Sequence, residues 1–297
     1  MATITEDVSA AIVKQKKLLL VDPHLEVDEL LKEALSGDSW DIERVPDNDT
    51  ALLFVKAGPF DLVITSQNTS GREDVELLRK IRRIRPHIRM IILTGKSTPE
   101  DVIASLRENA FSYFKPPFDR VLLADMVYQA VNEPCWDDGI EVISATPQWI
   151  RLMARCTPVT ADRLVQFLRQ ADLPEAEKDD LALAAHEMLL NAMEHGGKFD
   201  PNHYVEIDYL RTKRAVACRV KDPGQGFTFD ELRHAAVGSS PDDILSHMKV
   251  REDQGLRPGG FGIMLTQKLV DELIYNERGN DVILIKYLNP LTASAPS

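Results

Sequence analysis

Cysteine is scarce in this sequence, and its three residues are widely spaced: Cys135, Cys156 and Cys218. An odd number of distant cysteines excludes a disulfide framework and does not indicate a zinc site. No apolar run is long enough to span a bilayer, and the first residues lack the apolar region of a signal peptide. We therefore expect a soluble, cytoplasmic protein that does not contact a membrane.

Net positive charge is also lacking. The 297 residues carry a formal charge of −12 at pH 7, whereas a protein that binds nucleic acid through its phosphates needs a basic surface. The composition therefore argues against direct nucleic-acid binding. The hydrophobic share of 44% is ordinary for a globular protein, and the length predicts two domains.

Between residues 17 and 131, short apolar runs alternate with amphipathic segments. Strands are expected at 18–22, 40–45, 61–65, 90–95 and 111–114, and a helix is expected after each of them. Five such units predict a doubly wound α/β domain with a parallel sheet. Residues 1–16 are an N-terminal extension. Residues 132–139, with the sequence NEPCWDDG, interrupt the pattern and are the expected linker.

The order of elements changes after the linker. Strands are expected at 140–146, 150–156, 205–212, 215–222 and 282–288. Helices are expected at 161–170, 175–195 and 262–274. Neighbouring strands with helices grouped apart predict an α+β sandwich with one helical layer over residues 140–290, followed by a tail at 291–297.

The helix that ends in HEMLLNAMEHGG, residues 186–197, has a narrow polar stripe on an otherwise apolar circumference. At about 100° per residue, one side of this helix collects Glu187, Asn191, Glu194 and His195, with Asp180 earlier on the same side. Buried carboxylates are costly unless they are paired or bind a metal. The stripe therefore predicts a bound cation or ligand.

Two glycine-rich segments lie further along this domain. KDPGQGF, residues 221–227, ends a strand with an acid and continues with two glycines, and RPGGFGIML, residues 257–265, opens a helix. Glycines let backbone amides approach a phosphate, and a helix N-terminus favours negative charge. Each segment alone is typical of an ordinary turn.

In this order, the three segments together resemble the GHKL ATP-binding fold and, within it, the anti-sigma-factor serine/threonine kinases. The N-box pattern of that family matches Glu187, Asn191, Ala192, His195 and Gly196. The D-x-G-x-G-F pattern matches Asp222, Gly224, Gly226 and Phe227, and the later glycine box matches Gly259, Gly260 and Gly262. The resemblance covers residues 140–290.

The resemblance implies ATP and Mg²⁺ as cofactors. Asn191 would bind Mg²⁺, which prefers oxygen ligands and usually keeps several waters. Glu187 would be the general base that takes the proton from a serine or threonine hydroxyl. Asp222 would accept a hydrogen bond from the adenine amino group. Both glycine boxes would contact the nucleotide, and the segment between them would form a lid.

The first domain resembles a response-regulator receiver, which has a flavodoxin-like fold, but it lacks the residues for phosphorylation. Asp22, Thr94 and Lys115 match the receiver pattern, whereas Pro23 and Ser66 stand where receivers have carboxylates. An acyl phosphate needs a carboxylate nucleophile, and Mg²⁺ needs more acid than Asp22 alone supplies. We therefore expect a degenerate receiver that is not phosphorylated.

These resemblances imply an ATP- and Mg²⁺-dependent serine/threonine protein kinase that regulates transcription by partner switching. Its partners would be a sigma factor and a STAS-type anti-anti-sigma factor. One alternative is an ATP-binding interaction module that switches conformation without kinase activity. Another, an output protein driven by its own phosphorylation, is disfavoured by Ser66. The sequence leaves open whether the chain forms a homodimer. The receiver resemblance also implies a cis peptide bond between Lys115 and Pro116.

Overall fold

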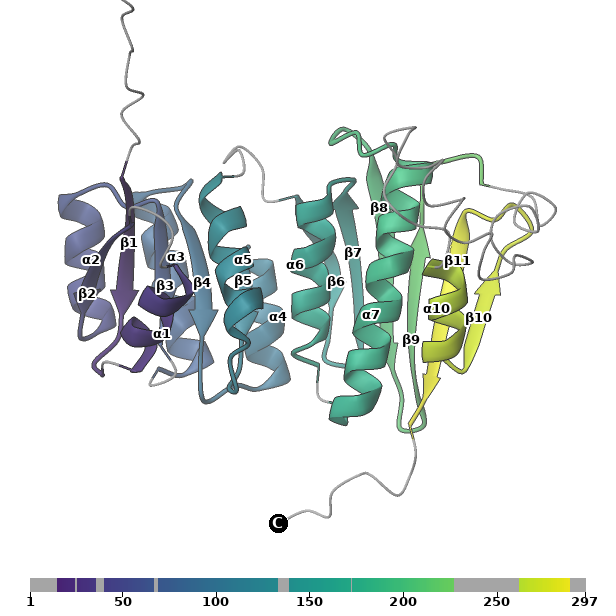
Figure 1. Ribbon diagram of the computed structural model, residues 1–297, viewed down its shortest axis with the longest axis horizontal. Coiled ribbons are helices and arrows are strands. Elements are labelled where there is room, and N and C mark those ends of the chain that lie inside the picture. The colour runs from purple at the N-terminus through teal and green to yellow at the C-terminus, as the bar shows by residue number, and fades with distance from the viewer. Residues whose placement is uncertain are drawn as a thin grey trace, which may run out of the picture.

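Two β-sheets, each with its own helices, make up the computed structural model. It describes residues 15–24, 26–35, 40–66, 69–132, 139–171, 173–226 and 262–288. The two domains lie side by side along the long axis of the molecule, the N-terminal one in purple and blue and the C-terminal one in teal to yellow (Figure 1). Within those ranges, no helix has the length and apolar character needed to cross a membrane.

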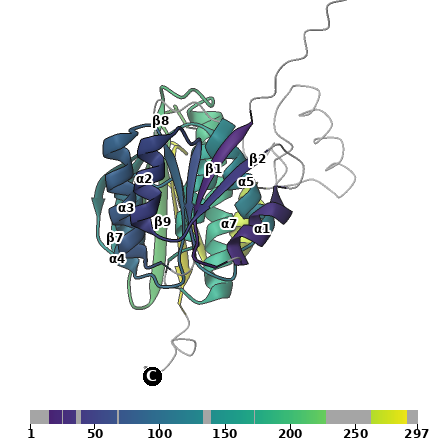
Figure 2. The same cartoon turned by 90° about the vertical axis from the view of Figure 1, so that its left-hand side faces the viewer.

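The N-terminal domain contains a five-stranded parallel sheet with the strand order β2-β1-β3-β4-β5. Its strands are β1 (Lys16–Val21), β2 (Trp40–Val45), β3 (Leu62–Thr65), β4 (Arg89–Leu93) and β5 (Ser112–Phe114). The helices are α1 (Glu26–Ala34), α2 (Asn48–Ala57), α3 (Gly71–Ile84), α4 (Pro99–Arg107) and α5 (Arg120–Asn132). They lie on both faces of the sheet (Figure 2), so the central strands are continuous apolar runs. The doubly wound α/β prediction is confirmed.

The C-terminal domain contains a six-stranded antiparallel sheet with the order β10-β11-β9-β8-β7-β6. Its strands are β6 (Ile140–Ala145), β7 (Trp149–Arg155), β8 (Tyr204–Arg211), β9 (Ala215–Lys221), β10 (Glu272–Tyr275) and β11 (Asp281–Tyr287). The helices are α6 (Pro158–Leu168), α7 (Glu175–Asn191) and α10 (Gly262–Leu269), and the π-helical turn η1 (Ala192–Gly196) extends α7. These helices lie on one face of the sheet (Figure 1). The α+β sandwich prediction is confirmed.

The helix expected at 262–274 is wrong in its second half. Helix α10 ends at Leu269, and residues 272–275 form strand β10, which pairs with β11. The change occurs at Asp271, whose backbone N–H donates to Ile285 O at 2.9 Å. The segment ELIY is rich in strand-forming residues, and helical periodicity does not reveal that an edge of β11 is available for pairing.

The expected position of the cis peptide bond is also wrong. The cis bond lies one residue later, between Pro116 and Pro117, and not between Lys115 and Pro116. Any bond that precedes a proline adopts cis far more readily than other peptide bonds. Two consecutive prolines therefore offer two positions, and the Lys-Pro pattern does not distinguish them.

Helix α6 joins the two domains by covering the open edge of β5. Arg163, only 4% exposed, donates from Nε to Phe111 O at 2.9 Å, and its guanidinium lies 4.6 Å from the centre of the Phe111 ring. Gln166 donates from Nε2 to Tyr113 O at 3.1 Å. A buried backbone acceptor without a partner costs about 1–3 kcal/mol. Side chains of the second domain therefore complete the edge of the first.

Further contacts lie on either side of this edge. Lys115 donates from Nζ to Gln170 O at 3.0 Å, and Arg107 donates from Nη2 to Ala145 O at 2.9 Å. Apolar side chains from both domains also belong to a single core cluster. Polar and apolar contacts together thus hold the receiver against the second domain.

We expect Arg163→Met to lower the free energy of unfolding by about 1–3 kcal/mol, because Phe111 O would stay buried without its donor. Calorimetry on the full chain measures this change. The matched control is Arg169→Met, which removes a surface pair with Asp179 at 2.7 Å and should cost less than about 1 kcal/mol. Equal losses in the two variants would contradict the role given to the β5 edge.

Candidate functional site

Glu187 and Asn191 lie one turn apart on α7, both half-buried, and both approach the first residue of α10. A methyl group on Gly262 would lie 2.6 Å from Glu187 Oε2 and 3.3 Å from Asn191 Nδ2. The absence of a side chain at Gly262 therefore permits this close approach. As a result, the N-terminus of α10, with its partial positive charge, lies against a carboxylate and an amide.

A second cluster forms where β9 ends. The Asp222 amide donates to Asn280 O at 3.0 Å, and Asp222 Oδ1 accepts from Gly224 N at 2.7 Å. Gly196, the last residue of η1, lies so close that a methyl group there would overlap with the Asp222 carboxylate. Burial raises the pKa of Asp222, and the Gly224 amide acts in the opposite direction. The N-box helix and the first glycine segment therefore meet at this carboxylate.

The C-terminal end of α7 widens into the π turn η1. The Gly197 amide donates to Ala192 O, five residues earlier, at 3.0 Å. Short π segments inside helices frequently occur at functional sites. A side chain is excluded at Gly197 as well, because a methyl group would overlap with Cys156 Sγ. The π turn therefore brings Gly196 into close contact with the Asp222 carboxylate.

Asn280 was not among the predicted site residues, yet its side chain holds the loop that follows β9. Its Nδ2 donates to Gly224 O at 3.2 Å, and its Oδ1 accepts from Asn276 Nδ2 at 2.9 Å. Gly226 in the same loop has a φ of +80° and contacts Arg278 so closely that no side chain fits. Asparagine and glycine are ordinary turn residues, and their presence in a sequence does not show which distant segment their side chains contact.

The other residues of the polar stripe, Asp180, Glu194 and His195, differ from one another in their surroundings. Asp180, which lies earlier on the same side of α7, pairs with Lys286 of β11 at 2.8 Å. His195 is exposed, and Glu194 is half-buried. Among the described residues, no group of three or more His, Cys, Asp or Glu side chains could hold a metal ion. Residues that share one side of the helix therefore meet different elements: Asp180 contacts β11, whereas Glu187 and Asn191 approach α10.

Part of the predicted site lies outside the described residues: Phe227, Gly259, Gly260 and the expected lid.

The predicted residues of the degenerate receiver site are bound to protein groups. Three of them are fully buried: Asp22, Ser66 and Thr94. Thr94 Oγ1 lies 2.9 Å from Thr69 O, and Thr69 Oγ1 donates to Ser66 O at 2.7 Å. Lys115 instead donates to Gln170 O in the second domain. The position after β3 therefore has a buried hydroxyl where acyl-phosphate chemistry requires a carboxylate.

A buried acid that sequence patterns did not reveal lies on α3 beside this site. Asp74 is fully buried, and its Oδ2 lies 3.0 Å from Thr69 Oγ1. Burial raises the pKa of Asp74 to about 8, so this carboxyl is mostly neutral at neutral pH. Acids in the first turn of a helix commonly face solvent and interact favourably with the helix dipole, so the sequence pattern does not distinguish Asp74 from an ordinary surface acid.

The raised pKa makes stability depend on pH. Below the ordinary pKa of 3.8, Asp74 is protonated in both the folded and the unfolded state, and its contribution to the free energy of unfolding is fully present. As the pH rises towards about 8, only the unfolded state ionises readily, and this contribution is lost. Relative to Asp74→Asn, the wild-type free energy of unfolding should therefore fall by up to about 1.4 kcal/mol per pH unit between about pH 5 and 7. Calorimetry across this range measures the difference. The control Asp125→Asn, at an exposed position on α5, should show the same pH dependence of unfolding as the wild type. If the free energy of unfolding of Asp74→Asn changed with pH in parallel with that of the wild type, the raised pKa of Asp74 would be contradicted.

Two family models match the chain. Residues 153–286 match the histidine kinase-like ATPase domain, and residues 18–128 match the response regulator receiver domain. The first range contains Glu187, Asn191 and Asp222. The chain therefore contains a receiver domain followed by a histidine kinase-like ATPase domain.

Similar proteins cover one half of the chain or the other. The serine-protein kinase RsbW of Listeria monocytogenes serotype 4a (strain HCC23) is 29% identical over 113 residues, which are 37% of this chain and 66% of that protein. The DNA-binding transcriptional regulator NtrC of Rhizobium meliloti (strain 1021) is 26% identical over 117 residues, 39% of this chain. The chain spans 24% of the length of that NtrC. The crystal structure of a response regulator from Thermotoga maritima has 21% identity and a TM-score of 0.37, and the match covers 40% of this chain and 99% of that one.

Proposed function

Because the chain joins a receiver domain to a histidine kinase-like ATPase domain, we propose that it is an ATP- and Mg²⁺-dependent serine/threonine protein kinase of the anti-sigma type. One observation carries the proposal: Glu187 and Asn191 converge on Gly262, at the N-terminus of α10. Phosphoryl transfer needs a base, a ligand for the metal and a positive environment for phosphate at one place. The likeness to the serine-protein kinase RsbW supports the same function.

Asp222 is the proposed adenine contact. Its Oδ1 already accepts from Gly224 N, so the second oxygen, Oδ2, is the atom that would accept from the adenine amino group. Asn280 holds the Gly224 carbonyl from the other side. The carboxylate is therefore oriented before the nucleotide binds, which reduces the entropy lost on binding.

Asn191 suits Mg²⁺ only in the presence of a nucleotide. Its side chain supplies a single oxygen, whereas Mg²⁺ requires six ligands and is often held by one or two protein oxygens, substrate phosphates and water. Because Gly262 has no side chain, that residue leaves space beside Asn191 and Glu187. When bound there, Mg²⁺ would neutralise phosphate charge.

Glu187 would act as the general base. Its carboxylate would accept the hydroxyl proton of a serine or threonine while that oxygen attacks the γ-phosphorus. A bond then forms between the hydroxyl oxygen and phosphorus, the bond from phosphorus to the β–γ bridging oxygen breaks, and ADP leaves. Glu187 lies one turn before Asn191, which places the base next to the metal ligand.

The proposed partners are a sigma factor and a STAS-type anti-anti-sigma factor, so that phosphorylation decides which of them is held. The receiver domain would contribute a surface and not a phosphorylation site, because Ser66 replaces the acceptor carboxylate. The second candidate function is an ATP-binding module that changes conformation without phosphorylating its partner. Both functions place ATP in the same site, so the role of Glu187 distinguishes them.

Asp222→Asn should weaken ATP binding roughly tenfold to a hundredfold. The amide can keep Oδ1 on Gly224 N, but its NH₂ group then faces the adenine amino group, and a buried donor without a partner costs about 1–3 kcal/mol. Inosine triphosphate, which has an oxygen in place of that amino group, should lose less affinity. Calorimetric titration with both nucleotides measures the change in preference.

The control for this variant is Glu277→Gln, which removes an exposed carboxylate from the turn before β11. It should bind ATP like the wild type. Unchanged ATP affinity in Asp222→Asn would remove Asp222 from the site.

Glu187→Gln and Asn191→Ala should differ in whether they lose only phosphoryl transfer or both ATP binding and phosphoryl transfer. Loss of the base lowers phosphoryl transfer by about 10²–10⁴ while ATP still binds, whereas loss of the metal ligand weakens both Mg²⁺-dependent ATP binding and transfer. The assay uses labelled ATP and a purified STAS-domain protein, together with a nucleotide titration of each variant. Glu177→Gln, the same change at the other end of α7, should leave both measurements unchanged.

Two outcomes would contradict the kinase proposal. Full transfer by Glu187→Gln would exclude Glu187 as the base. If the wild type bound ATP and a STAS partner but transferred no phosphate, the chain would be the interaction module.

A further inference from the structure

Lys286 on β11 joins α7 and α10 at a point away from the candidate site. Its Nζ donates to Asp180 Oδ2 on α7 at 2.8 Å and to the carbonyl oxygen of Leu269, the last residue of α10, at 2.7 Å. The Lys286 side chain is only 17% exposed. Carbonyls in the last turn of a helix have no partner within the helix, and a helix C-terminus carries partial negative charge. A single ammonium group therefore connects the end of α10 to α7.

The two points at which α10 meets α7 are matched in length. Gly262, the first residue of α10, approaches Glu187. Leu269 is joined through Lys286 to Asp180. Asp180 and Glu187 are seven positions apart, as are Gly262 and Leu269, and seven helical residues span about 10.5 Å. The two helices therefore run antiparallel, packed side by side (Figure 1), with one contact two turns from the other.

Thr266 connects the first turn of α10 to the rest of that helix. It is fully buried, and its Oγ1 donates to Gly262 O at 2.7 Å. One turn later, the Val270 amide donates to Thr266 O at 3.1 Å. A short helix linked in this way moves as one body, so a shift at its last residue also shifts its first.

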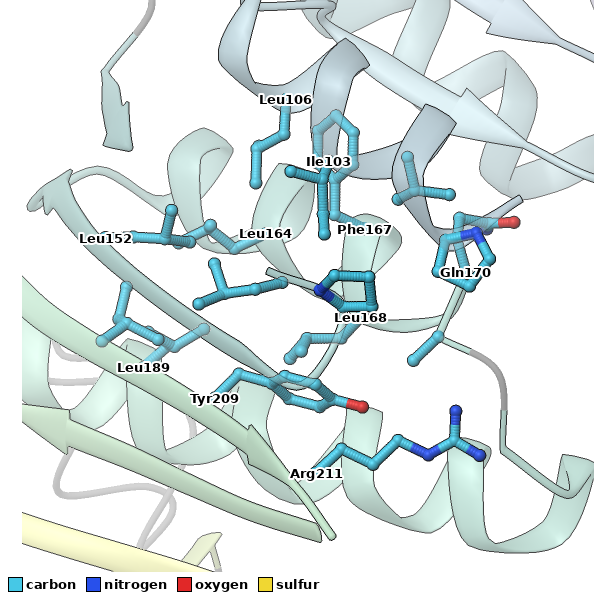
Figure 3. Close-up of a pocket in the computed structure, with 16 residues that line it drawn as sticks. Ile103, Leu106, Leu152, Leu164, Phe167, Leu168, Gln170, Leu189, Tyr209 and Arg211 are labelled. Carbon is cyan, nitrogen blue, oxygen red and sulfur yellow. The ribbon is translucent and has the colours of Figure 1, made fainter. Parts of the chain in front are cut away.

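The opposite side of α7 is fixed by apolar packing. Leu189 is two residues from both Glu187 and Asn191, which places it about 200° around α7 from each of them. It lines the same small apolar space as Leu164 of α6 and Ile103 of α4 (Figure 3). Helix α7 is thus held by α6 and the receiver on one side, and it supports α10 on the other.

We propose that Lys286 is a positioning residue for the nucleotide site. It contacts neither the nucleotide nor the metal, and it acts by holding the N-terminus of α10 against Glu187 and Asn191, where the phosphates would lie. The inference rests on the proposed function, because it requires a nucleotide at that place. Without the lysine, Asp180 and Leu269 O lose their common partner, and part of the binding energy of ATP is used to restore the position of α10.

Lys286→Met should lower the affinity for Mg²⁺–ATP about tenfold and leave the affinity for adenosine unchanged. The phosphates of ATP need α10, whereas adenosine depends on the Asp222 side of the site. Calorimetry for Mg²⁺–ATP and ligand-observed NMR for adenosine measure both affinities in the full chain. The control Lys268→Met removes an exposed cation from the last turn of the same helix and should bind both ligands like the wild type.

Asp180→Ala tests the same contact from α7, and it covers the case in which Lys286→Met does not fold. It should lower Mg²⁺–ATP affinity by less, about threefold, because Lys286 still donates to Leu269 O. Asp179→Ala is the matched control, since it removes a neighbouring carboxylate whose partner is Arg169. This control should bind Mg²⁺–ATP like the wild type.

Three outcomes would overturn the inference. Wild-type affinity for Mg²⁺–ATP in both Lys286→Met and Asp180→Ala would remove the positioning role and leave the nucleotide site intact. Equal loss of ATP and adenosine affinity in Lys286→Met would show a general loss of structure. If the wild type bound no ATP, the nucleotide site and the inference would fail together. A loss restricted to Mg²⁺–ATP would support the positioning role even if the chain transferred no phosphate.

Discussion

The structure depends on the hydrogen bonds with which α6 completes the open edge of β5. An edge strand exposes backbone groups that need a partner, and here Arg163 and Gln166 supply the donors to Phe111 O and Tyr113 O. Their burial lets the apolar cores of the two domains become continuous. The junction also packs α7, the helix of the candidate site, into the same apolar core as the receiver.

Within the second domain, close backbone approaches determine the site. Gly262 lies close to Glu187 and Asn191, and Gly196 lies so close to Asp222 that no side chain fits there. These two contacts bring two separate segments, the N-terminus of α10 and the loop after β9, to α7 and its π turn. Glycines therefore allow main chain to approach the polar groups of the site closely. This arrangement suits a ligand whose phosphates must meet backbone amides.

Local patterns in the sequence predicted the elements well and their partners poorly. The continuous apolar run LLLV identified a strand buried on both faces, and the three motifs predicted residues that the structure brings close together. The pattern failed at β10, where pairing with β11 outweighs helical periodicity. It also failed at Arg163 and Gln166, since polar residues on an amphipathic helix normally face solvent. Whether such a face is solvated or covers another strand depends on distant residues.

Lys115 shows how the two domains share their constraints. In the receiver pattern, this lysine belongs to the phosphorylation site, but here its Nζ donates to Gln170 O just beyond the C-terminus of α6. A helix C-terminus carries partial negative charge, so the cation is held at the junction by the helix itself. With Ser66 at the acceptor position, the receiver lacks the carboxylate that an acyl phosphate requires. The proposed loss of phosphorylation chemistry is therefore consistent with the position of Lys115, which contacts the second domain at Gln170 O.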